Sequence, residues 1–502
     1  MGTEAEAEQV CTLSAMQQGL FFNSMLAPGS GVDMVQFVFD LPEEVEPARM
    51  LDAWQRAADR HPILRSSFHA DGGGPAVLRV RPGARVPFAE HDWRTVAVAE
   101  QEGRLRAWLL EDRGRGVEFG TAPLLRLNLF RMQDRLWRLV WSWHHALLDG
   151  HSVFLLVREV FATYEALGAG ESPAPPPAPS FAEYIDWARA QDTSAAEGYW
   201  RGLLAGFAEP LPLPLDHVST LPFLAENYHE QLTHLEPGPT RALRALAREH
   251  GLTPNTVVQG AWAILLARYT GTCDVVFGNI RSGRRSTLAS APEIVGPLIS
   301  NVPVRVRLPE EERLLPWLQA LRAQHVEVRR FEHSPLVDIQ SWSEVPRGTP
   351  LFQTGIVFDN SSLRARFQAL GGAWERRGLT ILRQPNVPLA VGAYFDAEDR
   401  LTLRLGYYVD RLEHATVERM LGHFRRVLEE MVARPDRRLG ELDLMEDGER
   451  ERVVHAWSRA VEAAAPEATA HALVSAQALR TPDAVALEDS SGARLTYAEL
   501  ER

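Results

Sequence analysis

The chain alternates helical and strand-like patterns of apolar residues along its first 170 positions. Residues 47–59 have the pattern of an amphipathic helix, and residues 124–143 form two apolar runs around a turn near Gln133 and Asp134. A further helix begins next, and Ser152 is a suitable N-cap for it. Its apolar residues recur every three or four positions, as one buried helical face requires: Val153, Leu156, Val157, Val160, Phe161 and Tyr164.

The second half of the chain repeats this mixture after a proline-rich segment. Residues 173–179 cannot form a helix or a central strand, so they predict a stiff surface linker. Thr253 and Pro254 begin a helix that Gly271 ends. Its predicted buried face consists of Val258, Ala261, Trp262, Leu265, Leu266 and Tyr269. Strands are predicted at 274–278, 302–307, 355–358 and 401–407, and a last helix at 414–433.

Both halves therefore mix helices with sheets, and the predicted fold class is α/β (α+β). Two lobes that face each other across a cleft are the simplest architecture for this pattern. The residues after about Glu446 differ, because they are rich in alanine, acidic and helical in pattern.

Composition narrows the class of protein. The 502 residues carry a formal net charge of −13, which argues against a nucleic-acid binder. No apolar run approaches the ~20 residues of a membrane helix, and the acidic N-terminus does not resemble a signal peptide. Cys11 and Cys273 stand far apart, without metal or redox spacing, and predict a reduced, cytoplasmic compartment.

The strongest candidate for chemistry is the run from Trp141 to Gly150, which contains His144, His145 and Asp149. Successive strand residues point to opposite faces, so only one of the two histidines is expected to point into a given cleft. An imidazole titrates near neutral pH and suits acid–base chemistry. Asp149 is placed to hold the following turn, and Gly150 gives that turn its backbone freedom.

The residues alone leave a structural role and a catalytic role about equally supported for this run. A metal site is disfavoured because adjacent strand histidines point apart and no other His or Cys cluster completes a coordination shell. The segment 150–154 lacks the second glycine of a serine-hydrolase nucleophile elbow. No phosphate-binding loop or dinucleotide fingerprint is present either.

At these residues the chain resembles a known family. The pattern His144-His145-x-x-x-Asp149-Gly150 resembles the signature motif of nonribosomal peptide synthetase condensation domains. Segments 13–22, 60–68 and 181–187 are similar to that family's first, second and fourth motifs. The family's later motifs are similar to five further segments of this chain: 274–278, 282–284, 295–303, 333–336 and 350–360. Each motif is weak alone, but their order over most of the chain makes an accidental match very improbable.

The resemblance implies two chloramphenicol-acetyltransferase-like lobes in a V shape with a central substrate tunnel. Residues 1–175 would form the N-terminal lobe, and 176–446 the C-terminal lobe with its crossover segments. Residues 447–502 would form a linker and the truncated start of an adenylation domain, since segments 480–487 and 495–500 resemble that start. Trp143, Ser152, Asn301 and Asn360 are expected to line the tunnel.

The implied reaction joins a donor acyl or peptidyl thioester to the amine of an acceptor aminoacyl thioester. The candidate catalytic residues are His144, His145, Asp149 and Gly150; His145 would take a proton from the amine or orient it. Asp149 is expected to be structural and paired with an arginine such as Arg65 or Arg284. The domain itself would bind no cofactor, because its substrates arrive on phosphopantetheine arms or on coenzyme A.

The resemblance also implies partners: an upstream donor carrier protein or an acyl-CoA, a downstream acceptor peptidyl carrier protein, and the adjacent adenylation domain. Such synthetases make antibiotics, lipopeptides and other secondary metabolites. If Met1 is the natural start, the donor must arrive on another protein or as acyl-CoA, as in a starter condensation domain that attaches a fatty acyl group.

Three departures from the family pattern concern the expected substrate channel. Ser300-Asn301-Val302-Pro303 differs from the usual Asn-Thr-Leu-Pro, Asp359 stands where Glu is common, and His151 replaces a frequent Trp.

Four alternatives remain open. An epimerisation domain shares the His pair, but it does not normally precede an adenylation domain. A heterocyclisation domain would need a second Asp in place of the pair. The other two are a catalytically silent recruitment module and a free acyltransferase that uses coenzyme A.

Overall fold

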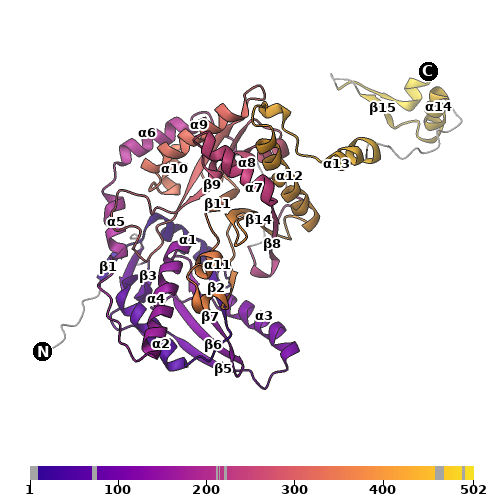
Figure 1. The fold of residues 1–502 in the computed structure, drawn as a ribbon. Helices are drawn as coiled ribbons and strands as arrows, with labels where there is room; N and C mark the ends of the chain where they lie inside the picture. The colour runs from indigo at the N-terminus through magenta and orange to yellow at the C-terminus, as the bar shows by residue number, and fades with distance from the viewer. Residues whose placement is uncertain are drawn as a thin grey trace. The chain divides into compact units, whose positions relative to one another are not determined.

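The computed structural model describes residues 9–70, 76–210, 213, 215–219, 223–457, 469–488 and 492–502. The chain divides into two compact units, Met1–Leu444 and Met445–Arg502. The first unit contains the predicted His144–Asp149 run and is described first (Figure 1).

A five-stranded sheet forms the framework of the N-terminal part of the first unit. Its strand order is β12-β2-β7-β6-β5. The strands are β2 (Met34–Leu41), β5 (Phe88–Asp92), β6 (Leu125–Gln133), β7 (Leu136–His144) and β12 (Gly378–Leu382). Alternate residues of β7 enter two different cores: Leu139 and Trp141 pack with helices α2 (Pro47–Arg60) and α4 (Gly150–Gly168). Val140 packs on the other face with α3 (Val98–Arg115).

A six-stranded mixed sheet forms the second framework, in the order β10-β9-β11-β13-β14-β8. Its strands are β8 (Tyr228–His234), β9 (Asp274–Arg281), β10 (Ser300–Arg307), β11 (Thr354–Asp359), β13 (Leu389–Phe395) and β14 (Leu401–Tyr408). Strand β11 runs parallel to both of its neighbours, and the other pairs are antiparallel.

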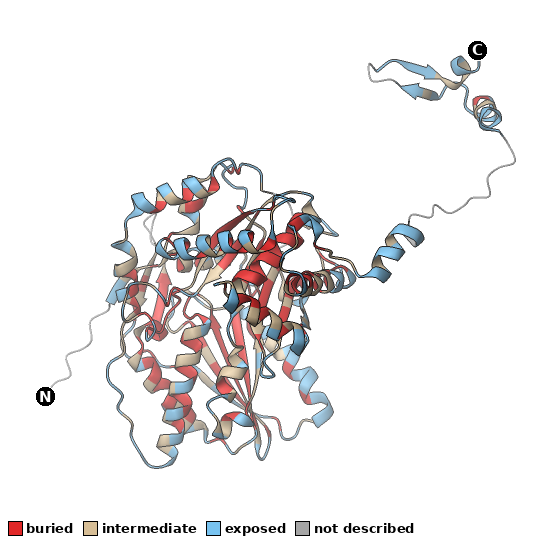
Figure 2. Ribbon diagram, turned by 45° about the horizontal axis from the view of Figure 1, so that its top comes forward, coloured by how far each residue is buried: buried red, intermediate tan, exposed pale blue. Residues whose placement is uncertain are grey.

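Helices cover both faces of this second sheet. One face packs on α7 (Pro237–Glu249), α8 (Pro254–Thr270), α9 (Leu314–Glu327) and α12 (His414–Ala433). The other face, at the β9–β10 edge, packs on α6 (Thr193–Leu204) and α10 (Leu336–Trp342). In Figure 2 the sheets are mostly red, whereas the covering helices turn pale blue faces outward, as layered α/β packing requires.

Two segments from the second half of the chain cross to the first sheet. Strand β12 pairs antiparallel with β2, with Thr380 opposite Val38. Just before it, α11 (Leu363–Gln368) packs against α4, where the rings of Phe154 and Phe367 lie 5.3 Å apart. The loop between β9 and β10 also crosses, because Ile294 and Leu298 are buried in the first core. The two sheets are therefore connected by segments that pack in the first core.

Smaller elements complete the first unit. A three-stranded sheet contains β1 (Gln9–Thr12), β3 (Ser66–His69) and β4 (Val77–Val80). The remaining α-helices are α1 (Ala15–Leu26) and α5 (Phe181–Arg189). Within the described residues, no helix is both long and apolar enough to cross a membrane. Both cysteines are free thiols, and Cys273 is exposed.

The second unit contains α13 (Asp447–Glu451), α14 (Ala470–Arg480), β15 (Val485–Glu488), β16 (Arg494–Thr496) and α15 (Tyr497–Leu500). Strands β15 and β16 form an antiparallel pair. The helical pattern predicted for this segment was therefore incomplete, because two short strands accompany its helices.

Most predicted elements are confirmed. Helix α12 has the predicted bounds, and α8 begins at Pro254 with Thr253 as its N-cap and Gly271 in the left-handed conformation at its end. Two details were wrong. The single buried face predicted for α8 is too narrow, because all residues from Thr256 to Ala267 are buried. Ser152 is not the N-cap of α4, since that cap is Asp149.

Candidate active site

The loop between β7 and α4 is fixed by hydrogen bonds on several sides. The backbone N–H of His145 donates to the carbonyl oxygen of Asp33 at 2.8 Å, and that of His144 donates to Leu124 at 3.1 Å. From helix α1, Gln17 donates its side-chain amide to the carbonyl oxygen of Ala146 at 3.0 Å. Because these partners come from three different parts of the chain, the loop has little freedom to move.

His144 lies inside the protein, with 1% of its surface exposed. Its Nδ1 accepts a hydrogen bond from the backbone N–H of Ala146 at 3.2 Å, so the ring proton sits on Nε2. Nε2 in turn donates to the hydroxyl of Ser24 at 2.9 Å. Burial, with a smaller effect of neighbouring His145, lowers the pKa of His144 to about 3. His144 is therefore a neutral, fully bonded ring with no nitrogen left for substrate.

His145 has a different environment although it is the next residue. Strand β7 ends at His144, so His145 lies in the loop, where its side chain is partly exposed. Its Nδ1 is buried without a hydrogen-bond partner, and no side chain among the described residues hydrogen-bonds to the ring. Burial lowers the pKa of His145, opposed by its own and Leu148's carbonyl groups and by the Asp149 charge. At neutral pH the ring is an uncharged base with free hydrogen-bonding capacity.

Asp149 is buried and holds the next turn of the loop. Its Oδ1 accepts the backbone N–H of Ser152 at 2.8 Å as the N-cap of α4. Both carboxylate oxygens lie 2.7 Å from Nη2 of Arg284, and Oδ2 accepts the N–H of Leu298 at 3.0 Å. The side chains of Asp149 and Arg284 are 1% and 7% exposed, so this is a buried ion pair between α4 and the β9–β10 crossing loop.

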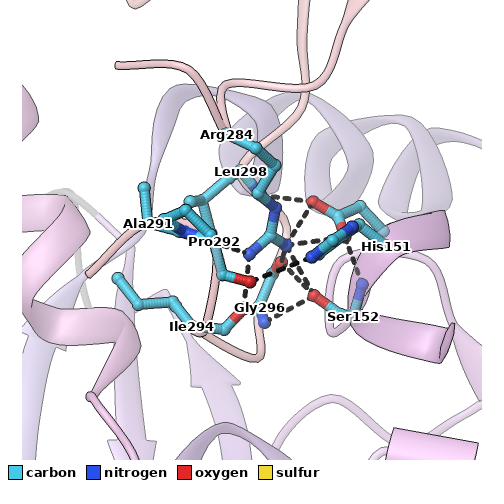
Figure 3. A network of polar contacts seen from close by, with 9 residues as sticks. His151, Ser152, Arg284, Ala291, Pro292, Ile294, Gly296 and Leu298 are labelled. Carbon is cyan, nitrogen blue, oxygen red and sulfur yellow. Dashed lines mark hydrogen bonds and ion pairs between the residues drawn. The ribbon is translucent and has the colours of Figure 1, made fainter. Parts of the chain in front are cut away.

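Arg284 extends this ion pair into a wider network with the crossing loop (Figure 3). Its guanidinium donates to the carbonyl oxygens of Ala291, Ile294 and Gly296 and to the hydroxyl of Ser152. Ser152 also accepts the N–H of Gly296 at 2.9 Å. The buried charge is thus compensated by one carboxylate and several oxygen acceptors, as a stable buried pair requires.

His151, next to this network, reaches the same loop. Its Nε2 lies 2.9 Å from the carbonyl oxygen of Pro292, which can only accept, so Nε2 carries a proton. The histidine that replaces a tryptophan of the family pattern therefore anchors the crossing loop to α4.

The structure brings together some of the sequence-predicted site residues and separates others. Arg284 meets Asp149, whereas Arg65 donates to the backbone oxygens of Ala58 and Asp59. Gly150 is the first residue of α4 and is exposed.

The expected tunnel lining needs correction at two of its four positions. Trp143 is buried in the first core, where its ring stacks on Trp141 with centroids 4.0 Å apart. Ser152 is fully buried in the Arg284 network. Neither residue lines an open passage, because packing and hydrogen bonding take up their side chains. Asn360 is exposed, and Asn301 is half-buried with an unpartnered Oδ1.

Two ionisable residues near the loop were not predicted from the sequence. Asp33 has a left-handed backbone with φ of 62°, and burial raises the pKa of its carboxyl group to about 7. Arg113, at the end of α3, is 6% exposed, and its Nε and Nη2 are buried without partners. Neither residue belongs to a periodic pattern; the only local signal is the turn-forming segment 28–31 before Asp33.

A cavity of about 370 Å³ lies between α3, β2, β12 and the start of β8. Arg113, Tyr228 and Arg383 are among its lining residues, and neither histidine of the pair is. Within the ranges that the structure describes, no cluster of three or more His, Cys, Asp or Glu side chains is placed to hold a metal ion.

Comparisons with known proteins point to the same family. The family model described as the condensation domain matches residues 7–454. One of the linear gramicidin synthase proteins of Brevibacillus parabrevis is 35% identical over 501 residues, which cover all of this chain and 6% of that protein. Bacitracin synthase 3 of Bacillus licheniformis is 28% identical over 480 residues, which cover 95% of this chain and 7% of that protein. The chain thus spans only a small part of these relatives.

Solved structures share the fold. A mutant of the starter condensation domain of rhizomide synthetase in complex with C8-CoA matches with a TM-score of 0.72 and 22% identity, covering 87% of this chain and 98% of that one. The X-domain from teicoplanin biosynthesis, solved in complex with OxyB, gives 0.73 and 23%, covering 89% and 98%. A four-domain nonribosomal peptide synthetase bound to AMP and glycine gives 0.75 and 19%, covering 98% and 38%. The predicted α/β fold class is therefore confirmed.

Proposed function

The chain belongs to the condensation domain family, and from this premise we propose that it forms an amide bond between two thioester-linked substrates. The amine nitrogen of the acceptor aminoacyl thioester attacks the carbonyl carbon of the donor acyl or peptidyl thioester. The donor C–S bond then breaks, the donor's pantetheine sulfur leaves as a thiol or thiolate, and the amine loses a proton. The thioester is already activated, so the reaction needs no covalent enzyme intermediate.

The state of the His145 side chain carries this proposal. It is the one ring of the pair that is partly exposed, and no described side chain hydrogen-bonds to it. The loop that bears it is held by Asp33 and by the Asp149–Arg284 ion pair. A neutral imidazole on a rigid loop suits either of two roles: accepting the proton of the attacking amine, or accepting a hydrogen bond that orients the amine.

The experiment is amide formation between a donor and an acceptor loaded on separate carrier proteins, measured as product by mass spectrometry. His145→Ala is expected to lower turnover by about 10²–10⁴-fold if the ring is a general base. A smaller loss would indicate positioning, because holding two tethered reactants together by itself removes a large part of the barrier. His234→Ala, an exposed histidine on β8, is the matched control. Undiminished turnover in His145→Ala would remove the residue from the mechanism.

The pH dependence separates these roles further. Since burial lowers the pKa of His145 below 6.5, the neutral ring persists into mildly acidic solution. A general base should therefore give a limb below pH 6.5 that disappears in His145→Ala. The α-amine of the acceptor, with a pKa of about 7.7–8.0, gives a separate limb that the substitution does not move. A limb below pH 6.5 that survives the substitution would assign the proton transfer to another group.

A second candidate function is recruitment without catalysis. The X-domain, a structure solved in complex with OxyB, shares the fold as closely as the starter condensation domain does, so the fold cannot separate the two functions. The partly exposed His145 ring, to which no described side chain hydrogen-bonds, favours catalysis. Absence of amide product from wild-type protein with any loaded carrier pair would favour recruitment instead.

The partners in this proposal are a donor carrier protein or an acyl-CoA, an acceptor carrier protein and an adenylation domain. The gramicidin synthase relative matches all of this chain, although the family model ends at residue 454. That match supports residues 447–502 as the linker and beginning of an adenylation domain. Offering the same acyl group on a carrier protein and on coenzyme A would test the starter subtype, in which coenzyme A is an efficient donor.

A further inference from the structure

Arg113 has an unusual electrostatic environment for a buried cation. Its side chain makes no hydrogen bond and no ion pair with any residue that the structure describes, although its Nε and Nη2 are buried. Its sequence neighbour Asp112 makes its hydrogen bonds elsewhere, with Arg126 at Oδ1 and with Gln36 and Ser142 at Oδ2. A buried guanidinium without an acceptor is costly, so an acceptor from outside the described chain is expected to complete it.

The cavity beside Arg113 is the place where such an acceptor can enter. Its volume of about 370 Å³ falls within the usual size of small-molecule sites. Aliphatic side chains from α3, β2 and β12 form much of the wall: Val38, Leu105, Leu109, Leu110, Ile381 and Leu382. An apolar wall with a cation at one side fits a short aliphatic chain that carries an anionic group.

Apart from Arg106, which is exposed on α3, the other charged residues of this cavity are already matched to each other. Arg138 bonds to Asp40 and to Glu102, and Glu230 accepts the hydroxyl of Tyr228 and lies 3.6 Å from Arg383. Every carboxylate of the lining therefore has a partner other than Arg113. In a chain with a net charge of −13, a locally uncompensated, buried cation marks a site for an anion.

Packing connects Arg113 to the His145 loop. The side chain of Arg113 lies against Gly31, where an added Cβ would meet Arg113 Cγ at 2.4 Å. Two residues later, the carbonyl oxygen of Asp33 holds the backbone of His145. The cavity thus adjoins the segment that positions the candidate catalytic ring.

We propose that this cavity binds a carboxylate carried by one of the tethered substrates, with Arg113 as its ion-pair partner and specificity residue. The inference deepens the proposed function and rests on it. The carboxylate can belong to the donor acyl group or to the side chain of the acceptor amino acid, and the chemistry of recognition is the same.

The turnover experiment compares each acid with its uncharged amide. Succinyl and succinamoyl groups are offered as donors in one arm, and aspartyl and asparaginyl groups as acceptors in the other. Wild-type protein is expected to prefer the acid by about tenfold or more in one arm, as a charged hydrogen bond implies. Arg113→Gln should abolish that preference, and Arg115→Gln, an exposed arginine on the same helix, should keep it. Equal use of acid and amide in both arms overturns the inference.

A binding measurement keeps this inference separate from the proposed reaction. Calorimetric titration uses pantetheine analogues of the same four acyl groups, in which an amide replaces the thioester. A preference for an acid that Arg113→Gln removes supports the carboxylate site even if no amide product ever forms. No preference in wild-type protein overturns it. The Tm of Arg113→Gln is expected to stay the same or rise, because an unpaired buried charge is removed; a large fall would show an internal partner and also overturn the inference.

Discussion

Replacing Asp149 with alanine is expected to lower the free energy of unfolding by about 3–5 kcal/mol. The substitution leaves Arg284 buried without its carboxylate, with only carbonyl and hydroxyl oxygens around the charge. It also removes the acceptor of the backbone N–H of Ser152 and one of the two acceptors of the Leu298 N–H, which keeps its bond to the carbonyl oxygen of Gly296. An unsatisfied buried donor costs roughly 1–3 kcal/mol, so the Ser152 N–H adds to the cost of the stranded charge.

The measurement is urea unfolding of the full chain, followed by tryptophan fluorescence. Asp92→Ala is the matched control, because Asp92 pairs with Arg94 in a similar close geometry but at the exposed surface. That exposed pair should contribute little to stability, because solvent screens it. The double variant Asp149→Ala with Arg284→Met should be more stable than the sum of the single losses predicts, since it removes the stranded charge. A loss in Asp149→Ala no larger than that in Asp92→Ala would refute the structural role of this ion pair.

Three further changes test other parts of the structure. Asp33→Asn should remove a pH dependence: burial raises the carboxyl pKa from 3.8 to about 7, so stability in the wild type falls by up to about 4 kcal/mol as pH rises through this window. Urea unfolding at pH 5 and pH 8 measures this change in the free energy of unfolding. The control is Asp399→Asn, because Asp399 is an exposed aspartate with a φ of 58°. An equal change between the two pH values in Asp33→Asn and in wild type would contradict the reasoning. Gly283→Ala should lower Tm, because φ is 63° and an added Cβ would lie 2.1 Å from the carbonyl oxygen of Leu298. Gly170→Ala is the control and should lower Tm less, because Gly170 has a φ of 80° but open space around it. Equal losses in Tm would argue against the clash. Trp374→Ala should release the β12 crossing segment by removing contacts with Phe161 and Phe367, costing about 3–5 kcal/mol. In Trp374→Ala, amide hydrogen exchange relative to wild type should become faster in β12 than in β11. Unchanged exchange in β12 would contradict this release.

The elements that sequence predicted well are those determined by local signals. Helix α8 has a capping Thr253, Pro254 at its first position and Gly271 at its end, and each signal acts within one turn of the backbone. The β6–β7 hairpin was found because two apolar runs flank a polar turn. The His144–Asp149 run was also visible, because its residue types are unusual at a strand-to-helix junction.

What sequence did not predict depends on contacts between distant segments. Nothing in residues 378–382 indicates that they pair with β2, more than 330 positions earlier. The N-cap of α4 was placed at Ser152 because serine caps helices well, but Asp149 caps it, and the hydroxyl of Ser152 bonds to Gly296 instead. Arg113 was not recognised because an arginine in a helix is usually exposed, and only the tertiary packing buries it without a partner.

The segment 31–33 explains how neighbouring histidines acquire opposite environments. The register of β2 and β7 ends with Met34 opposite His144, and the left-handed backbone at Asp33 turns the chain away at that point. His144 is therefore the last residue inside the sheet, and His145 leaves it with only its backbone N–H bound to Asp33. Because Gly31 also provides the space for Arg113, a change in this segment should alter both the candidate base and the proposed carboxylate site. Gly31→Ala should accordingly raise KM for the preferred acid and lower kcat together, whereas Arg113→Gln should alter only the preference between acid and amide. If Gly31→Ala changed only KM or only kcat, the two sites would not be linked through this segment.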